Sequence, residues 1–168
     1  EDTLPLDDLG YCIFHSKNIE WKRKNHFSVF LVKLLEIIDL IDKEKLIYET
    51  PNGFLDIDLR GIEWIGNILS NENESEISFK DISFNSYVSL IMHGGHFHDK
   101  LIVDKIDANN TTLDFSNCTF ENIISITSSK LKDISLDCCY LKGGIDMGQC
   151  EIIDVCEFYK MQVKGGFI

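Results

Sequence analysis

Apolar residues recur along the second two-thirds of the chain in a pattern that repeats every ten to eleven residues. Each copy contains the motif apolar-x-apolar, two residues that turn the chain, and a second motif in which a small or apolar residue replaces the first apolar one. Because alternate side chains of a strand point to opposite faces, each motif predicts a short strand with two inward side chains. The clearest copies begin at Leu113, Ile124, Ile134, Ile145 and Cys156. Such a short, persistent period is typical of a solenoid, a chain that winds and stacks on itself.

Two copies of the pattern account for one coil of about 20–22 residues. Leu113, Ile134 and Cys156 lie 21 and 22 residues apart and should therefore stack in successive coils. The sequence predicts a mainly β chain, with a solenoid of parallel strands over residues 54–168. An ordinary antiparallel β domain is the other architecture that the alternation allows. The side chains predicted to fill the interior are Phe115, Phe120, Leu131, Leu136 and Leu141.

The segment from Asp114 to Asn122 resembles the repeat unit of the pentapeptide-repeat family. That unit places a small residue inward and a bulky Leu or Phe two positions later, as Cys118 and Phe120 do here. The resemblance implies a right-handed quadrilateral parallel β-helix. Ile124 and Ile134 occupy a first inward position that is usually small in the family, so a less regular right-handed β-helix is the alternative.

The first 53 residues do not repeat, and we expect residues 1–53 to form an α-helical cap on the open end of the first coil. From His26 to Lys45 apolar residues recur at helical spacing, and Asn25 is placed to cap the start of this helix. Apolar positions cover so much of its circumference that burial on more than one side is expected, with part of that face available to a partner. The basic aromatic segment Trp21–Lys24 is expected to be a solvated turn.

The charge, the apolar runs and the cysteine positions of the chain exclude some classes of function. The chain has 28 acidic and 16 basic residues and a net charge of −12. This balance argues against direct nucleic-acid binding, which needs a basic surface. No long uncharged apolar run exists, so no membrane span is expected. Cys118, Cys139 and Cys150 fall at the small inward position, which favours free thiols and a cytoplasmic location, in a bacterium or in a host cell if the protein is a secreted effector.

Candidate chemistry is concentrated in the segment His93–Asp99. Its His96 and His98 should lie on the outside of a coil, with Glu121 near His98 one coil later. Two imidazoles and a carboxylate can hold zinc. No third His or Cys lies at a fixed spacing, so His96, His98 and Glu121 are only weak metal candidates, and no metal, cofactor or catalytic residue is predicted. Asp99 and Glu121 are an alternative pair for carbohydrate cleavage.

Three functions are consistent with these features. The first is a non-enzymatic protein-interaction or scaffold module, one domain of a larger bacterial protein such as an effector, as pentapeptide-like solenoids often are. The second is an acidic decoy that resembles the gyrase-protecting pentapeptide proteins, whose negatively charged rod imitates duplex DNA. A decoy needs continuous acidic columns, whereas the outward column Glu121, Lys142 and Lys164 becomes basic. The third is a carbohydrate-active β-helix.

The last coil is the predicted site of association. The pattern begins a new strand at Phe167, with no cap after it. A bare coil end exposes unpaired backbone groups and the apolar side chains of Met161, Val163 and Phe167. These three residues are the predicted interaction surface for a protein partner, for a downstream domain of the same protein, or for a second copy packed end to end.

Overall fold

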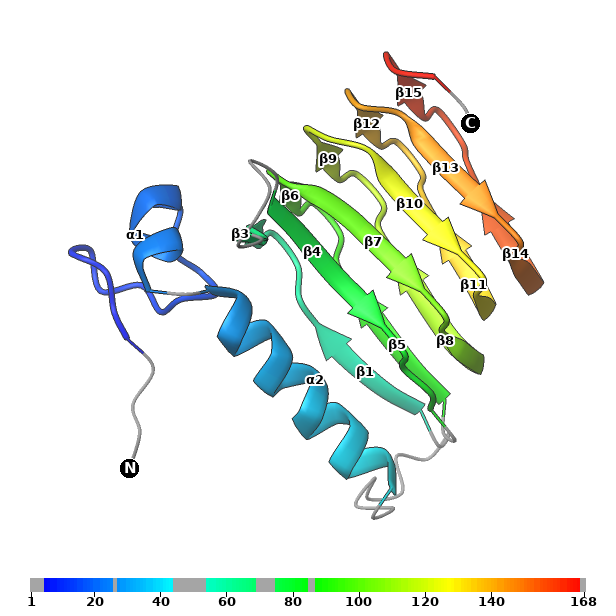
Figure 1. The fold of residues 1–168 in the computed structure, drawn as a ribbon, viewed down its shortest axis with the longest axis horizontal. Helices are drawn as coiled ribbons and strands as arrows, with labels where there is room; N and C mark the ends of the chain where they lie inside the picture. The colour runs from blue at the N-terminus through cyan, green and yellow to red at the C-terminus, as the bar shows by residue number, and fades with distance from the viewer. Residues whose placement is uncertain (1–4, 26, 44–53, 69–74, 85–86, 167–168) are drawn as a thin grey trace.

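The computed structural model describes residues 5–25, 27–43, 54–68, 75–84 and 87–166. It is a β-solenoid of about four turns preceded by two helices (Figure 1). The helix α2 (Phe27–Lys43) lies alongside β1 (Phe54–Asp58) at one end of the stack, and β15 (Gln162–Val163) lies at the other end. The predicted solenoid class is thus confirmed, whereas the right-handed coil rests on the family resemblance and stays a prediction.

Three five-stranded sheets form sides of the solenoid. The first comprises β1, β5 (Tyr87–Ile91), β8 (Asp107–Asp114), β11 (Lys130–Ser135) and β14 (Glu151–Glu157). The second comprises β3 (Asn67–Ile68), β4 (Ser75–Lys80), β7 (Lys100–Asp104), β10 (Ile124–Thr127) and β13 (Ile145–Gly148). The third comprises β2 (Glu63–Trp64), β6 (His96–Phe97), β9 (Thr119–Phe120), β12 (Tyr140–Leu141) and β15. Between these strands only β3 and β4 pair antiparallel, so the antiparallel alternative is wrong.

Equivalent residues of successive coils stack in register. Leu113 pairs with Ile134, and Ile134 pairs with Cys156, as their spacing predicts. The five side chains predicted to fill the interior are all at most 1% exposed: Phe115, Phe120, Leu131, Leu136 and Leu141. The inward phase of the repeat is therefore confirmed.

One interior column is an aromatic ladder. The ring centroids of Trp64 and Phe97 lie 5.3 Å apart with the planes 2° from parallel, and those of Phe97 and Phe120 lie 4.5 Å apart at 16°. The column continues through Leu141 to Val163. Stacked rings contribute about 0.5–1.5 kcal/mol per pair beyond the area that they bury. The ladder therefore stabilises the first coils more than the last.

The neighbouring column holds the small inward residues, among them Gly95, Cys118 and Cys139. A Cβ atom at Gly95 would lie 3.0 Å from Nε1 of Trp64, so the bulky ladder leaves little space here. The thiols of Cys118 and Cys139 donate to backbone carbonyls at 3.0 and 2.9 Å. All six cysteines are free, and burial raises the pKa of Cys139 to about 12. The buried thiols act as small filler, as predicted.

The described part of the N-terminal region contains two helices, whereas one was predicted. The shorter, α1 (Ile19–Lys24), covers the segment expected to be a solvated turn, so that expectation is wrong. Asn18 caps its start by accepting from the backbone N–H of Trp21 at 3.0 Å. Asn25, predicted to cap the start of the helix from His26 to Lys45, instead ends α1. Both its backbone and side-chain nitrogens donate to the carbonyl of Trp21.

Among its described side chains, the long helix α2 is buried on one face only. Phe27, Leu31 and Ile38 are buried in the common core, and the ring of Phe27 meets Trp64 edge-on at 6.1 Å. The opposite face exposes about half of each of four apolar side chains: Val29, Val32, Ile37 and Leu40. Burial on more than one side was therefore a wrong expectation, because the described first coil covers a single face. Neither helix in the described part of the chain has the length and apolarity that a membrane crossing requires.

The domain boundary proposed between residues 53 and 54 adjoins a segment, 44–53, outside the described residues. The division into 1–53 and 54–168 stays a prediction. The described chain agrees with it to the extent that helices precede the first strand at Phe54.

Substituting Ala for Phe120 should lower the free energy of unfolding by about 3–5 kcal/mol, because the stacked neighbours cannot collapse into the space. The matched control is Phe158→Ala in the last coil, where the ring is already 40% exposed; we expect a loss of about 1–2 kcal/mol. Urea denaturation measures both. Equal losses would contradict the burial difference between the two coils.

Candidate functional site

His96 and His98 lie on the outside of the solenoid, as predicted, on either side of the buried Phe97. Their imidazole rings approach each other, with centroids 4.0 Å apart. Both side chains are partly buried, at 34% and 22% exposure. They are therefore held at the surface of the third sheet, in contrast to His93 in the preceding turn, which is exposed.

Glu63 of β2 is the residue that completes this cluster, and it was missed from the sequence. It pairs in register with His96, one coil earlier. Its Oε2 lies 2.8 Å from Nε2 of His98 and 3.3 Å from Nδ1 of His96. Ligand-capable atoms of the three residues all lie within 4.8 Å of one another.

Glu121 is held next to His96, although it was predicted near His98. Its Oε1 lies 2.8 Å from Nε2 of His96, on the side of the ring away from Glu63. Lys142 of the next coil donates to both carboxylate oxygens at 2.6 and 2.8 Å. The hydrogen bonds from Lys142 and His96 hold the pKa of Glu121 below its ordinary value. The carboxylate is therefore ionised and fixed.

Two lysines of the N-terminal cap bind backbone carbonyls of the first coil. Lys17 donates to the carbonyl of Gly61 at 2.8 Å, and Lys22 donates to that of Glu63 at 2.7 Å. The carbonyls of Ile62 and Trp64, which alternate with these, accept N–H groups from the next coil. The carbonyls that face the cap thus receive their hydrogen bonds from lysine side chains, whereas the carbonyls that face the next coil receive theirs from its backbone.

Lys22 is fully buried. Its Nζ also donates to the carbonyl of Phe14 at 3.0 Å and lies 4.6 Å from the ring centroid of Phe27. Burial lowers the pKa of Lys22 to about 8, because the ammonium has left bulk water. The Lys22 ammonium, with two carbonyl acceptors and an aromatic ring beside it, therefore connects the cap to the first coil.

The charge of Lys17 also reaches the histidine cluster. Its Nζ lies 3.0 Å from Oε1 of Glu63, so Oε2 of Glu63 remains for the histidines. Burial raises the pKa of Glu63, but hydrogen bonds from His98 and Lys17 outweigh it and leave the pKa below its ordinary value.

Asp99 serves the cap rather than the cluster. It is buried and accepts from Arg23 of α1 at 3.2 Å, from the backbone N–H of Gly66 at 2.9 Å, and from the hydroxyl of Ser75. Asp99 and Glu121 therefore have different hydrogen-bond partners, and carbohydrate cleavage by this pair stays a prediction.

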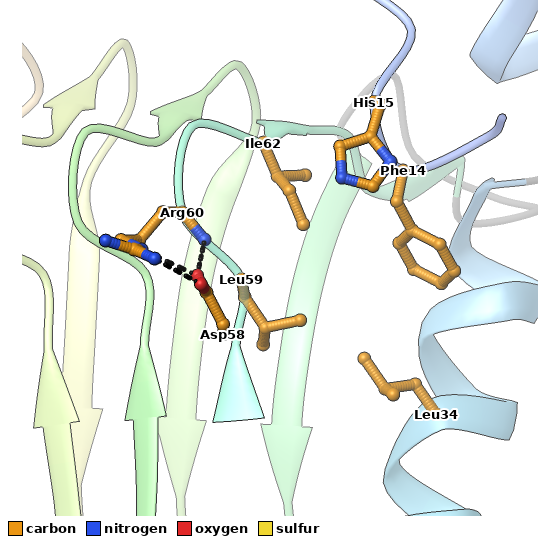
Figure 2. Close-up of a pocket in the computed structure, with 7 residues that line it drawn as sticks. All are labelled: Phe14, His15, Leu34, Asp58, Leu59, Arg60 and Ile62. Atoms are coloured by element: carbon orange, nitrogen blue, oxygen red, sulfur yellow. Dashed lines mark hydrogen bonds and ion pairs between the residues drawn. The ribbon is translucent and has the colours of Figure 1, made fainter. Parts of the chain in front are cut away.

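A cavity of about 570 Å³ separates the cap from the first coil (Figure 2). The cap lines it with Phe14, His15 and Leu34. The coil lines it with Asp58, Leu59, Arg60 and Ile62. Arg60 points at Asp58 rather than into the open space (Figure 2), and its hydrogen bonds lower the pKa of Asp58 to about 2. These two charges neutralise each other, so the cavity offers mainly an apolar lining.

Of the three residues predicted to form the interaction surface, Met161 and Val163 are partly buried and pack against the core, and Phe167 lies outside the described residues, so this surface stays a prediction. The last coil exposes other apolar side chains. Its strands β13, β14 and β15 are each at the edge of a sheet. Four further side chains of this coil are at least 40% exposed: Ile153, Val155, Phe158 and Tyr159. We call residues 145–163, which include β13, β14 and β15, the open end.

Comparison of the chain with protein-family models, curated proteins and solved structures finds no match. The candidate sites therefore stand on the geometry of this chain.

Replacing Lys22 with Met should lower the free energy of unfolding by about 1–3 kcal/mol, because two partly buried carbonyls lose their donor. Lys24→Met is the matched control on the same helix; its side chain is exposed, and the expected change is within about 0.5 kcal/mol. Urea denaturation followed by circular dichroism gives both values. If the two variants are equally stable, Lys22 does not hold the cap.

Proposed function

We propose that the chain is a non-enzymatic protein-interaction module, a pentapeptide-repeat-like scaffold within a larger bacterial protein such as an effector. The observation that carries this proposal is the contrast between the open end and the coil beneath it. Leu136 is buried, whereas Phe158, its counterpart one coil later, is 40% exposed. Ile134 is buried, whereas its register partner Cys156 is exposed.

The open end combines two features that favour binding a polypeptide. The edge strands β13, β14 and β15 present backbone N–H and C=O groups without a strand partner among the described residues. Apolar side chains lie beside these groups. Added strands gain affinity from backbone hydrogen bonds and specificity from alternate side chains. The partner is therefore an extended polypeptide with apolar side chains at alternate positions.

A second copy of the chain is the simplest partner of this kind. A two-fold axis through the open end would bring the same three strand edges and the same apolar residues together from each copy. This arrangement is the end-to-end homodimer expected from the sequence. A downstream domain or a different protein with the same alternation meets the same chemical requirement.

The DNA-decoy alternative has less support. Lys142 forms a salt bridge with Glu121 across two coils, and Lys130 does so with Glu151. Such pairs interrupt the continuous negative surface that a DNA mimic needs. The free thiols of all six cysteines favour a reducing compartment, so we place the module in the cytoplasm, of a bacterium or of a host cell.

The test compares wild type with the variant Phe158→Asp plus Met161→Glu. Sedimentation velocity at increasing concentration detects a second copy, and selection from a displayed library of short random peptides detects other extended partners. We expect association in at least one assay and its loss in the variant, since each acidic side chain would be desolvated in the interface.

The matched control is Val32→Asp plus Leu40→Asp, which makes the same type of change on the exposed face of α2. It should leave association unchanged. The proposal fails if wild type is monomeric and selects no peptide, or if the α2 variant loses binding while the open-end variant keeps it.

A further inference from the structure

Glu63, His96 and His98 bring a carboxylate oxygen and two ring nitrogens close together, and a neutral His96 cannot satisfy both of its carboxylate neighbours by hydrogen bonding. A neutral imidazole has one N–H and one lone pair. His96 faces a carboxylate at each ring nitrogen, Glu63 at 3.3 Å from Nδ1 and Glu121 at 2.8 Å from Nε2. If Nε2–H donates to Glu121, the lone pair of Nδ1 faces an oxygen of Glu63. Two acceptors then confront each other unless a cation, either a proton on Nδ1 or a metal ion, lies between them.

A metal ion on the Nδ1 side of His96 resolves this conflict. Zinc binds imidazole nitrogen and carboxylate oxygen at about 2.0–2.2 Å, so tetrahedral ligand atoms lie about 3.3 Å apart. Oε2 of Glu63 and Nδ1 of His96 are 3.3 Å apart, and Oε2 and Nε2 of His98 are 2.8 Å apart. Small side-chain rotations would seat an ion among the three atoms.

The surroundings are those of a metal-binding histidine. Such a ring almost always donates its other N–H to a carboxylate or carbonyl, which fixes its orientation. Glu121 stands at that position for His96 and is itself held by Lys142. Lys17 occupies only Oε1 of Glu63. The partial exposure of both histidines leaves a path for the ion and room for water as a fourth ligand.

We propose that Glu63, His96 and His98 bind one divalent zinc ion that joins the first coil to the second. Glu63 belongs to β2 and His96 to β6, which are adjacent strands of the third sheet. Because Lys17 of the cap also holds Glu63, the ion stabilises the capped end of the solenoid. This site is independent of the open end and of its partner.

The test is thermal unfolding of the untagged, metal-free protein with and without zinc. At a free zinc concentration about 100 times the dissociation constant, the melting temperature should rise by about 5–10 °C. Isothermal titration should give one ion per chain. Cobalt added in place of zinc should give the visible absorption of a tetrahedral site with nitrogen and oxygen ligands.

The double variant His96→Gln plus His98→Gln should lose all three signals, since the amides keep hydrogen bonding but bind zinc weakly. Glu63→Gln should weaken zinc binding at least tenfold. His93→Gln is the matched control on an exposed histidine of the same segment and should behave as wild type. If zinc does not shift the wild type, or shifts the double variant equally, the site does not exist.

Discussion

The structure depends on one constraint, that each coil must lay its inward side chains directly over those of the coil before it. Backbone pairing sets this register, and the interior is then shared by all coils rather than divided among them. A bulky column such as Trp64, Phe97 and Phe120 requires a small column beside it, which explains Gly95 and Cys118. The side-chain volumes of the repeat are therefore coupled both along and across the stack.

The same constraint explains why the first coil needs charged side chains to cover it. A parallel strand at an end has every second carbonyl directed away from the stack. In β2 and the turn before it, these are the carbonyls of Glu63 and Gly61, and the amines of Lys22 and Lys17 satisfy them. A lysine side chain is flexible and has three N–H donors. It can therefore reach these carbonyls without pairing in register, as a further strand would have to do.

The sequence predicted the solenoid, its inward positions and its stacking because a repeated pattern averages out local ambiguity. The predictions failed for features that do not follow the repeat. The burial of Lys22 could not be predicted, since lysine is almost always exposed unless tertiary structure supplies partners. Glu63 was missed because 33 residues separate it from His96 instead of one coil length. Aligning the copy that contains Trp64 with the copy that contains Phe97 would have placed Glu63 over His96.

The aromatic ladder also makes the two ends of the solenoid unequal in stability. Its members shrink along the stack, from Trp64 through Phe97 and Phe120 to Leu141 and Val163. Each coil of a solenoid contacts only its neighbours, so order can be lost one coil at a time. Fraying therefore starts from the coil of Val163 and proceeds toward the rings, and the aromatic coils are the last segment to open. Mechanical or thermal stress would therefore unfold the coils one after another, starting from the C-terminal coil.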